Sequence, residues 1–172
     1  VLELGCAGGA TGKLMKETLS VNHYVGVEIS EQAAKEARAH IDQVIVSDGE
    51  TTDLSAQGIE RGSFDLVLAL DVLEHLYDPW EMLVRLADYL RPGGNLVASI
   101  PNVRNVTILR DLLQGKWPYA DAGILDATHL RFFTRDSIQA MFQGAGLPVK
   151  HMDVVLNPPL DAGKLKEHGN SL

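Results

Sequence analysis

The sequence predicts an α/β fold in which a doubly wound, mostly parallel sheet lies between two layers of helices. Three observations lead to this prediction. Short apolar runs alternate with helical segments up to Pro101, the runs are continuously apolar, and a glycine-rich turn follows the first of them. Repeated strand–helix–strand units give parallel strands with right-handed crossovers. Continuously apolar strands indicate a sheet that is covered on both faces.

The predicted elements alternate regularly along the chain. Strands are expected at residues 1–4, 24–29, 43–46, 64–70 and 95–100, with one further strand at 147–156. Helices are expected at residues 12–19, 31–40, 79–90, 102–115 and 135–144. Ser30 is the predicted N-cap of the second helix, because its hydroxyl can accept a hydrogen bond from the first turn. Residues 50–63 are expected to form a loop with one weak helical turn.

The helix predicted at residues 79–90 is amphipathic, and residues 91–94 (Arg-Pro-Gly-Gly) are expected to end it. Its apolar face holds Trp80, Leu83, Leu86, Ala87 and Leu90. This pattern predicts that Trp80 lies in the core.

Length and composition fit a single globular domain. The chain has 172 residues, of which 45% are hydrophobic and 22% are charged, as is ordinary for a globular protein that buries a sizeable core. We expect one domain at residues 1–156, with an insertion at about residues 102–134 on the carboxyl edge of the sheet. Residues 157–172 are expected to form a loosely ordered tail.

The charge balance and the absence of long apolar runs bear on partners. The net charge is −8, so there is no electrostatic footprint for a nucleic acid. Cys6 is the single cysteine, which excludes an intrachain disulfide and fits a reducing compartment. No apolar run approaches about 18 residues and no signal-peptide pattern is present. These observations predict no membrane partner and a cytoplasmic location, and they leave the oligomeric state open.

The glycine-rich turn indicates a nucleoside-containing cofactor. Glycines there allow positive φ and a close approach of the backbone to a ligand, at the point where open α/β sheets bind nucleotides. The order Gly5, Gly8, Gly9, Gly12 does not match the Gly-x-Gly-x-x-Gly spacing of dinucleotide folds. A carboxylate at Glu3 would repel a pyrophosphate and could accept a hydrogen bond from a cationic amine. The sequence therefore favours a zwitterionic cofactor.

Five motifs occur in order between residue 1 and about residue 146. They are residues 3–9 (Glu-Leu-Gly-Cys-Ala-Gly-Gly), Glu28, residues 48–49 (Asp-Gly), residues 64–67 (Phe-Asp-Leu-Val) and residues 71–76 with 90–94. Together they resemble class I S-adenosylmethionine-dependent methyltransferases. The last motif (Asp-Val-Leu-Glu-His-Leu with Leu-Arg-Pro-Gly-Gly) resembles the ubiquinone-biosynthesis-like branch that acts on small molecules. The resemblance implies a Rossmann-like, three-layer αβα fold with a sheet of the seven-stranded type, here one strand short.

The resemblance also implies S-adenosylmethionine as cofactor and a set of residues around it. Gly5, Gly8 and the loop at Cys6 would line the amino-acid part, with Glu3 beneath. Glu28 would accept hydrogen bonds from both ribose hydroxyls. The remaining implied contacts are made by Ile29 beside the adenine, Asp48 and Gly49 at the adenine amine, and Leu70 and Asp71 at the methionine moiety.

Simpler structural roles compete with these assignments. Glu28 could be a solvated strand end, Asp48 a turn residue, and the glycines a tight turn without a ligand. Cys6 is favoured as a small packing residue over a catalytic thiol.

Two clusters could serve the chemistry. The first is Asp71, Glu74 and His75, which would share one face of a helical turn and act as a base or a divalent-metal site. The alternative, favoured for His75, is that Glu74 and His75 cap or solvate the start of the helix at Pro79. We assign no metal ligand from the sequence.

The second cluster lies in residues 126–134, a stretch that recurs in the resembling branch over the acceptor pocket. His129 is the leading general-base candidate, and Arg131 could clamp an acidic group of the acceptor. Both residues could instead fix the insertion in place. Trp117 and Tyr119 are expected to anchor the insertion in the core, with an aromatic wall for the acceptor as the alternative.

The sequence thus predicts a methyltransferase that acts on a small-molecule acceptor, with O-methylation favoured. Residues 157–160 (Asn-Pro-Pro-Leu) resemble the signature of amino-group methyltransferases, but that signature belongs directly after the fourth strand, where this chain has residues 71–74 (Asp-Val-Leu-Glu). We interpret residues 157–160 as tail. The alternatives are a non-catalytic cofactor-binding module of a larger protein and, less favoured, an NAD-dependent reductase.

Overall fold

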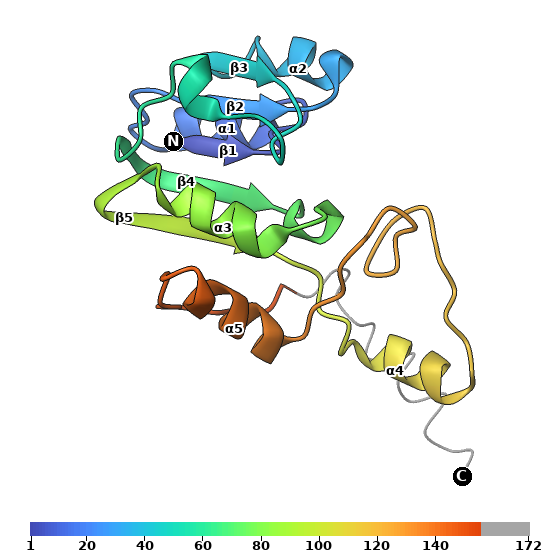
Figure 1. Cartoon of the computed structure of the whole chain (residues 1–172). Coiled ribbons are helices and arrows are strands. Elements are labelled where there is room, and N and C mark those ends of the chain that lie inside the picture. Colours follow the sequence, from blue (N-terminus) through green and yellow to red (C-terminus); the bar gives the residue numbers. More distant parts are fainter. Residues whose placement is uncertain (156–172) are drawn as a thin grey trace.

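The computed structural model describes residues 1–155 and contains one five-stranded parallel sheet (Figure 1). The strands are β1 (Leu2–Leu4), β2 (Val25–Glu28), β3 (Gln43–Val46), β4 (Phe64–Leu70) and β5 (Leu90–Ser99). Their order in the sheet is β3-β2-β1-β4-β5, and all neighbouring pairs are parallel. The order reverses between β1 and β4, which is where open α/β sheets bind ligands. The predicted tail and residues 157–160 lie outside the described residues.

Helices cover both faces of this sheet, as predicted. They are α1 (Ala10–Thr18), α2 (Glu31–Ala37), α3 (Pro79–Ala87), α4 (Val106–Leu113) and α5 (Arg135–Gly144), with 3₁₀ turns η1 (Leu54–Gln57) and η2 (Leu73–His75). Alternate strand residues feed two separate cores. Val67 of β4 packs in the core beneath α3 and α5, whereas the adjacent Leu68 packs in the smaller core with Tyr24 and Ile41. The three-layer αβα fold is therefore confirmed.

Local signals fix the residues at which α2 and α5 begin, although α2 ends at Ala37 and not at residue 40. Ser30 accepts a hydrogen bond from the Ala33 backbone N–H at 3.3 Å, as an N-cap does. Thr134 and Ser137 form a reciprocal capping box at the start of α5. The predicted single helical turn between residues 50 and 63 is the 3₁₀ turn η1.

Two predicted features of α3 are wrong. The helix ends at Ala87, and β5 begins at Leu90 with the Arg-Pro-Gly-Gly sequence inside it. An irregularity in the pairing of β4 with β5 accommodates these residues. Trp80 is 48% exposed, not in the core. The buried stripe of α3 runs through Met82, Leu83 and Leu86, and Trp80 lies at the flank of that stripe, beside Phe133.

The predicted strand at residues 147–156 is also wrong for the part that the structure describes. Residues 147–155 form no strand, so the sheet of the described chain ends at β5. Pro148 has no N–H to donate to a ladder. Val154 and Val155 are largely exposed, so these apolar side chains do not pack in the core.

The segment between Pro101 and Thr134 leaves the sheet at its carboxyl edge and returns before α5 (Figure 1). It holds α4, capped by Asn105, which accepts from the Thr107 N–H at 2.9 Å. The chain returns to the sheet through residues 126–134, which we call the returning segment. The Phe133 carbonyl of this segment accepts a hydrogen bond from the Val103 N–H. Among residues 1–155, no helix is both long and apolar enough to cross a membrane.

Candidate functional site

A cavity of about 480 Å³ opens at the carboxyl ends of β1, β2, β3 and β4. This volume lies within the range of small-molecule sites. The lining comes from four strand ends and the turns that follow them: Leu4, Gly5, Val27, Glu28, Ile29, Ser47, Asp48, Gly49, Glu50, Asp71, Val72, His75, Leu76 and Tyr77.

Six of the ten predicted cofactor residues line this cavity: Gly5, Glu28, Ile29, Asp48, Gly49 and Asp71. The other four, Glu3, Cys6, Gly8 and Leu70, are not part of its lining. His75 is the one predicted catalytic residue in the lining. Sequence reasoning missed Ser47, Glu50 and Tyr77, although Ser47 directly precedes the Asp-Gly pair and could have been found from that position.

The backbone is strained on both sides of the cavity. Gly5 has φ +73°, and a Cβ there would lie 3.0 Å from Val72 Cγ2. Two residues other than glycine also have positive φ, Ala7 at 44° and Asp71 at 50°. Such left-handed residues persist where surrounding structure holds them, and they concentrate at binding sites. Here they turn the chain sharply where β1 and β4 end, so that both turns face the cavity.

Glu28 organises the turn after β1. Its Oε2 accepts from the Ala7 N–H at 2.9 Å, and its Oε1 accepts from the Ser30 N–H at 2.8 Å. The carboxylate therefore joins the glycine-rich loop to the start of α2. Each carboxylate oxygen has a further lone pair, and Glu28 lines the cavity. Its contacts leave capacity for hydroxyl donors.

Glu3 and Cys6 support the loop from below. Glu3 is buried and accepts from the Tyr24 hydroxyl at 2.8 Å. Burial raises the pKa of the Glu3 carboxyl above its usual value, while the Tyr24 hydrogen bond opposes that shift. Burial also raises the pKa of the Cys6 thiol to about 12, which makes it an inert packing group. This agrees with the favoured packing role.

The turn after β3 presents Asp48 and Gly49. Asp48 Oδ1 accepts from the Glu50 N–H at 2.9 Å, which is a turn role. A Cβ on Gly49 would lie 2.4 Å from Leu4 Cδ1. Arg85 of α3 reaches across and donates to the carbonyls of Gly49, Glu50 and Thr52. Arg85 is thus the residue that fixes this turn, and nothing in the local sequence indicated it.

Replacing Arg85 with alanine is expected to loosen this turn. Three carbonyls would lose a charged donor, so we expect about 1–3 kcal/mol lower stability and about tenfold weaker binding of a cofactor at the cavity. Thermal unfolding and calorimetric titration with S-adenosylhomocysteine measure the two effects. Arg61→Ala is the matched control, because Arg61 pairs with Asp88 on the exposed surface. Equal effects from both variants would contradict the role of Arg85.

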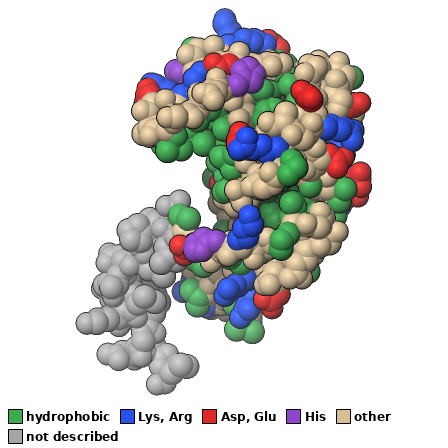
Figure 2. Space-filling model, turned by 90° about the vertical axis from the view of Figure 1, so that its left-hand side faces the viewer, with side chains coloured by type: hydrophobic (Ala, Val, Ile, Leu, Met, Phe, Trp, Pro, Cys, Tyr) green, Lys and Arg blue, Asp and Glu red, His purple; other side chains and the backbone are tan. Residues whose placement is uncertain are grey.

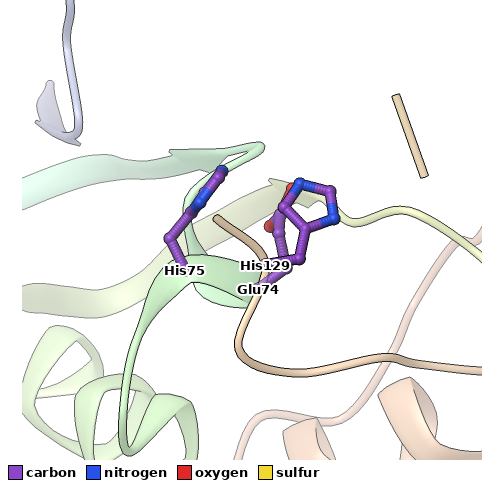
Figure 3. A group of neighbouring side chains, drawn as sticks. All are labelled: Glu74, His75 and His129. Atoms are coloured by element: carbon purple, nitrogen blue, oxygen red, sulfur yellow. The ribbon is translucent and has the colours of Figure 1, made fainter. Parts of the chain in front are cut away.

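Glu74, His75 and His129 form a cluster beside the cavity (Figure 3). Glu74 and His75 come from η2, and His129 comes from the returning segment, where the Leu130 and Arg131 N–H groups donate to the Glu74 carbonyl. One potential ligand atom from each side chain lies within 4.8 Å of the others. The rings of His75 and His129 meet edge to face at 4.7 Å.

Glu74 is the most unusual side chain of this cluster. It is 1% exposed, and neither carboxylate oxygen has a hydrogen-bond partner among the described residues. Burial raises the pKa of the Glu74 carboxyl to about 7. The predicted shared helical face is wrong, because η2 begins at Leu73 and Asp71 lies before it with φ 50°. The capping role is wrong too: Asp78 caps α3, accepting from the Glu81 N–H at 3.0 Å.

The Arg131 side chain is held by a backbone carbonyl. Its guanidinium donates to the Tyr77 carbonyl, which ties the returning segment to the turn that follows η2. A role for Arg131 at an acceptor stays a prediction. Trp117 packs edge to face on Phe132 at 5.4 Å, within the segment. Tyr119 is exposed, so its predicted place in the core is wrong.

Comparison with known proteins shows the family. Residues 1–151 match the family described as a methyltransferase domain. The chain belongs to this methyltransferase domain family. It is 31% identical over 165 residues to a ubiquinone biosynthesis O-methyltransferase of Cereibacter sphaeroides, covering 92% of this chain and 64% of that protein. A protein of the same name from Idiomarina loihiensis is 36% identical over 112 residues, covering 62% and 43% of the two chains. The chain thus spans less than two thirds of these relatives.

Solved structures show the same fold. A Haloferax volcanii methyltransferase in complex with the Trm112 activator superposes with a TM-score of 0.70 at 21% identity, covering 93% of this chain and 65% of that one. The CurJ carbon methyltransferase gives 0.64 at 24% identity, with 90% and 43% covered. The [4+2]-cyclase SpnF gives 0.62 at 17% identity, with 84% and 50% covered. The fold is Rossmann-like, of the class I methyltransferase type.

Family membership implies S-adenosylmethionine as the cofactor, and the cavity fits it. Gly49 leaves no space for a Cβ and the positive φ of Gly5 disfavours one, so backbone atoms form the wall of the cavity at these two positions. The Ser47 hydroxyl lies buried in the lining without a hydrogen-bond partner among the described residues. Ile29, 70% exposed at the rim, offers an apolar surface for an adenine.

Proposed function

We propose that this chain is the methyl-transferring domain of an enzyme that methylates a hydroxyl group of a small-molecule acceptor. The observation that carries the proposal is that Glu28, Asp48, Gly5 and Asp71 converge on one cavity, and that His75 shares its lining. We assign cofactor binding to Gly5, Glu28, Asp48 and Asp71. Membership of the methyltransferase family supports it.

The chain's own residues have three tasks in such a reaction. S-adenosylmethionine supplies a methyl group on a positively charged sulfur when bound, and its transfer leaves a neutral thioether. Glu28 accepts from the ribose hydroxyls, and the turns at Gly5 and Asp71 align the donor end. Glu3, Cys6 and Gly8 support the loop without lining the cavity, and Leu70 holds Asp71 at the end of β4.

The acceptor hydroxyl must lose a proton, and the cluster beside the cavity is the group able to receive it. His75 lines the cavity, whereas His129 lies behind it with a side chain that is 6% exposed. We therefore assign contact with the acceptor to His75 and support of the cluster to His129. Arg131 holds the segment that carries His129. This refines the expectation that His129 is the direct base.

The acceptor is proposed to be a small molecule. The relatives are named for ubiquinone biosynthesis, so hydroxylated aromatic compounds are the first class to test. On the face drawn in Figure 2, acidic and basic side chains are interspersed and do not gather in one basic stretch. The prediction of no nucleic-acid partner rests on the net charge of −8. A cytoplasmic location and the absence of a membrane partner stay predictions.

The alternative is a cofactor-binding module without methyl transfer. One solved structure with this fold is named as a [4+2]-cyclase. Because the fold thus also occurs in a protein named for another reaction, we retain the cofactor-binding module as the alternative. Formation of S-adenosylhomocysteine with an acceptor separates the two. An NAD-dependent reductase stays disfavoured by the spacing of the glycines.

The test is an assay of S-adenosylhomocysteine release with hydroxylated aromatic acceptors. His75→Gln is expected to lower kcat by about 100-fold or more, with little change in affinity for S-adenosylhomocysteine. His151→Gln is the matched control, since His151 is exposed and should leave both values unchanged. Full turnover in His75→Gln would contradict its role, and no turnover with any acceptor despite cofactor binding would favour the module.

A further inference from the structure

The starting point is the unpartnered carboxylate of Glu74. Both of its oxygens are buried without a hydrogen-bond partner among the described residues. Burying a carboxylate without a partner costs far more than burying an apolar group, so such groups are paired, protonated or bound to a metal ion. No lysine or arginine forms an ion pair with Glu74 in the described chain; its nearest basic partner there is His129.

The hydrogen bonds of His129 define which of its nitrogens faces Glu74. Nδ1 lies 3.0 Å from the Ile124 carbonyl, and a carbonyl can only accept, so Nδ1 carries the proton. In the neutral ring, Nε2 is then an acceptor. This Nε2 lies 3.9 Å from Glu74 Oε1. With Glu74 ionised and the His129 ring neutral, two acceptor atoms therefore face each other in a buried site.

His75 is oriented in the same way. Its Nδ1 lies 3.2 Å from Thr128 Oγ1 and 3.3 Å from the Thr128 carbonyl. The Thr128 hydroxyl donates to Asp126 at 2.7 Å, so its proton is already used and Nδ1 of His75 is the donor. A histidine whose Nδ1 is held by an oxygen acceptor leaves Nε2 free as a ligand. This is the supporting arrangement that metal-binding histidines share.

The 3.9 Å distance between Glu74 Oε1 and His129 Nε2 bears on whether a proton or a metal ion joins them. A hydrogen bond between nitrogen and oxygen needs at most about 3.2 Å, so this gap is too wide for a shared proton. Ligand atoms around a tetrahedral divalent ion with bonds of about 2.0–2.2 Å lie about 3.3–3.6 Å apart. Glu74 Oε1 and His129 Nε2 must therefore close from 3.9 Å by about 0.5 Å, and the third ligand by up to about 1.5 Å from the 4.8 Å limit. Rotation of the half-buried His75 can supply the larger movement.

We propose that Glu74, His75 and His129 bind one divalent transition-metal cation, of the zinc class. Two imidazoles and one carboxylate suit such ions, and three protein ligands leave a position open for a substrate atom. His75 places that open position at the cavity lining. From the sequence we assign no metal ligand and keep a metal site at Asp71, Glu74 and His75 as an alternative. The proposed site keeps Glu74 and His75 and has His129 in place of Asp71.

The role of the ion rests on the proposed function. An acceptor hydroxyl bound at the open position would have its pKa lowered by the cation, and its proton would leave to solvent through the cavity. His75 would then act as a ligand and not as a direct base. A loss of turnover in His75→Gln cannot separate these roles, so metal binding itself must be measured.

The experiment titrates the metal-stripped chain with Zn²⁺ by calorimetry and with Co²⁺ by visible absorption. We expect one ion per chain and a Co²⁺ spectrum with nitrogen ligands. Glu74→Gln keeps the shape of the side chain, and it is expected to weaken Zn²⁺ binding by at least about 100-fold, since even supporting residues contribute 10–100-fold. His129→Gln should do the same, and the exposed His151→Gln should not.

Each outcome has one meaning. Absence of stoichiometric binding, or binding that survives both Glu74→Gln and His129→Gln, overturns the metal site. A parallel titration with S-adenosylhomocysteine keeps the two proposals apart. Cofactor binding without metal binding refutes the metal site alone. Metal binding without cofactor binding refutes the proposed function and leaves the site standing. Thermal unfolding of Glu74→Gln confirms that the variant is folded.

Discussion

Replacing Glu28 with alanine is expected to weaken S-adenosylhomocysteine binding by about 100-fold. Two hydrogen bonds from ribose hydroxyls to a carboxylate contribute about 1.5 kcal/mol each, and about 3 kcal/mol corresponds to roughly that factor. The same carboxylate also holds the Ala7 and Ser30 N–H groups. Its loss therefore removes a cofactor contact and loosens the loop. Calorimetric titration measures the dissociation constant.

The control is Glu31→Gln in the first turn of α2. Glu31 is an exposed acid close to Glu28 in the sequence, and it pairs with Arg38 on the surface. Its replacement is expected to leave cofactor affinity within about twofold, because exposed ion pairs contribute little. If Glu28→Ala binds as tightly as the original chain, then Glu28 is a solvated strand end and the placement of the ribose is wrong.

Replacing Gly26 with valine is expected to produce the largest loss of stability. Gly26 lies in β2 between β1 and β3. A Cβ there would lie 2.4 Å from Cys6 Sγ and 2.6 Å from Ile41 Cδ1. Overpacking of this kind costs about 3 kcal/mol, or a fall in Tm of roughly 10 °C. Valine is itself favoured over glycine in strands. A loss of stability in this variant therefore comes from the steric clash and not from strand preference.

Gly144→Ala is the matched control for this variant. Gly144 ends α5, and a Cβ there would meet no atom within 4 Å. Alanine is favoured over glycine in helices by about 0.5–1 kcal/mol, so we expect Tm to stay equal or rise. Thermal unfolding checks both variants. An unchanged Tm in Gly26→Val would mean that Cys6 and β2 are not packed as described.

The sequence predicts the strand and helix order because each element carries its own signal. The strands β3 and β4 and the helix α5 have the predicted bounds, since continuous apolar runs and a capping box act locally. The cavity also follows from the sequence, because parallel strands bring their carboxyl ends to one edge. The family resemblance implies Glu28, Asp48 and Asp71 as cofactor residues, and all three lie at that edge.

The features that the sequence missed depend on long-range contacts. The role of Arg85 cannot be recognised from its neighbours in the sequence, because it arises only when the turn at residues 49–52 packs against α3. His129 is far from Glu74 in the chain, and their pairing needs the returning segment to bind the Glu74 carbonyl. Trp80 is exposed because the stripe of α3 is centred elsewhere. The spacing of apolar residues predicts that a helix forms. It does not determine how that helix is rotated about its own axis against the sheet.

The measurement that tests the central claim most directly is a calorimetric titration of the chain with S-adenosylhomocysteine, with NADH as the comparison. The account predicts binding of one S-adenosylhomocysteine per chain with a micromolar dissociation constant and no binding of NADH. Binding of NADH alone, or of neither compound, would contradict the assignment of the cavity to S-adenosylmethionine.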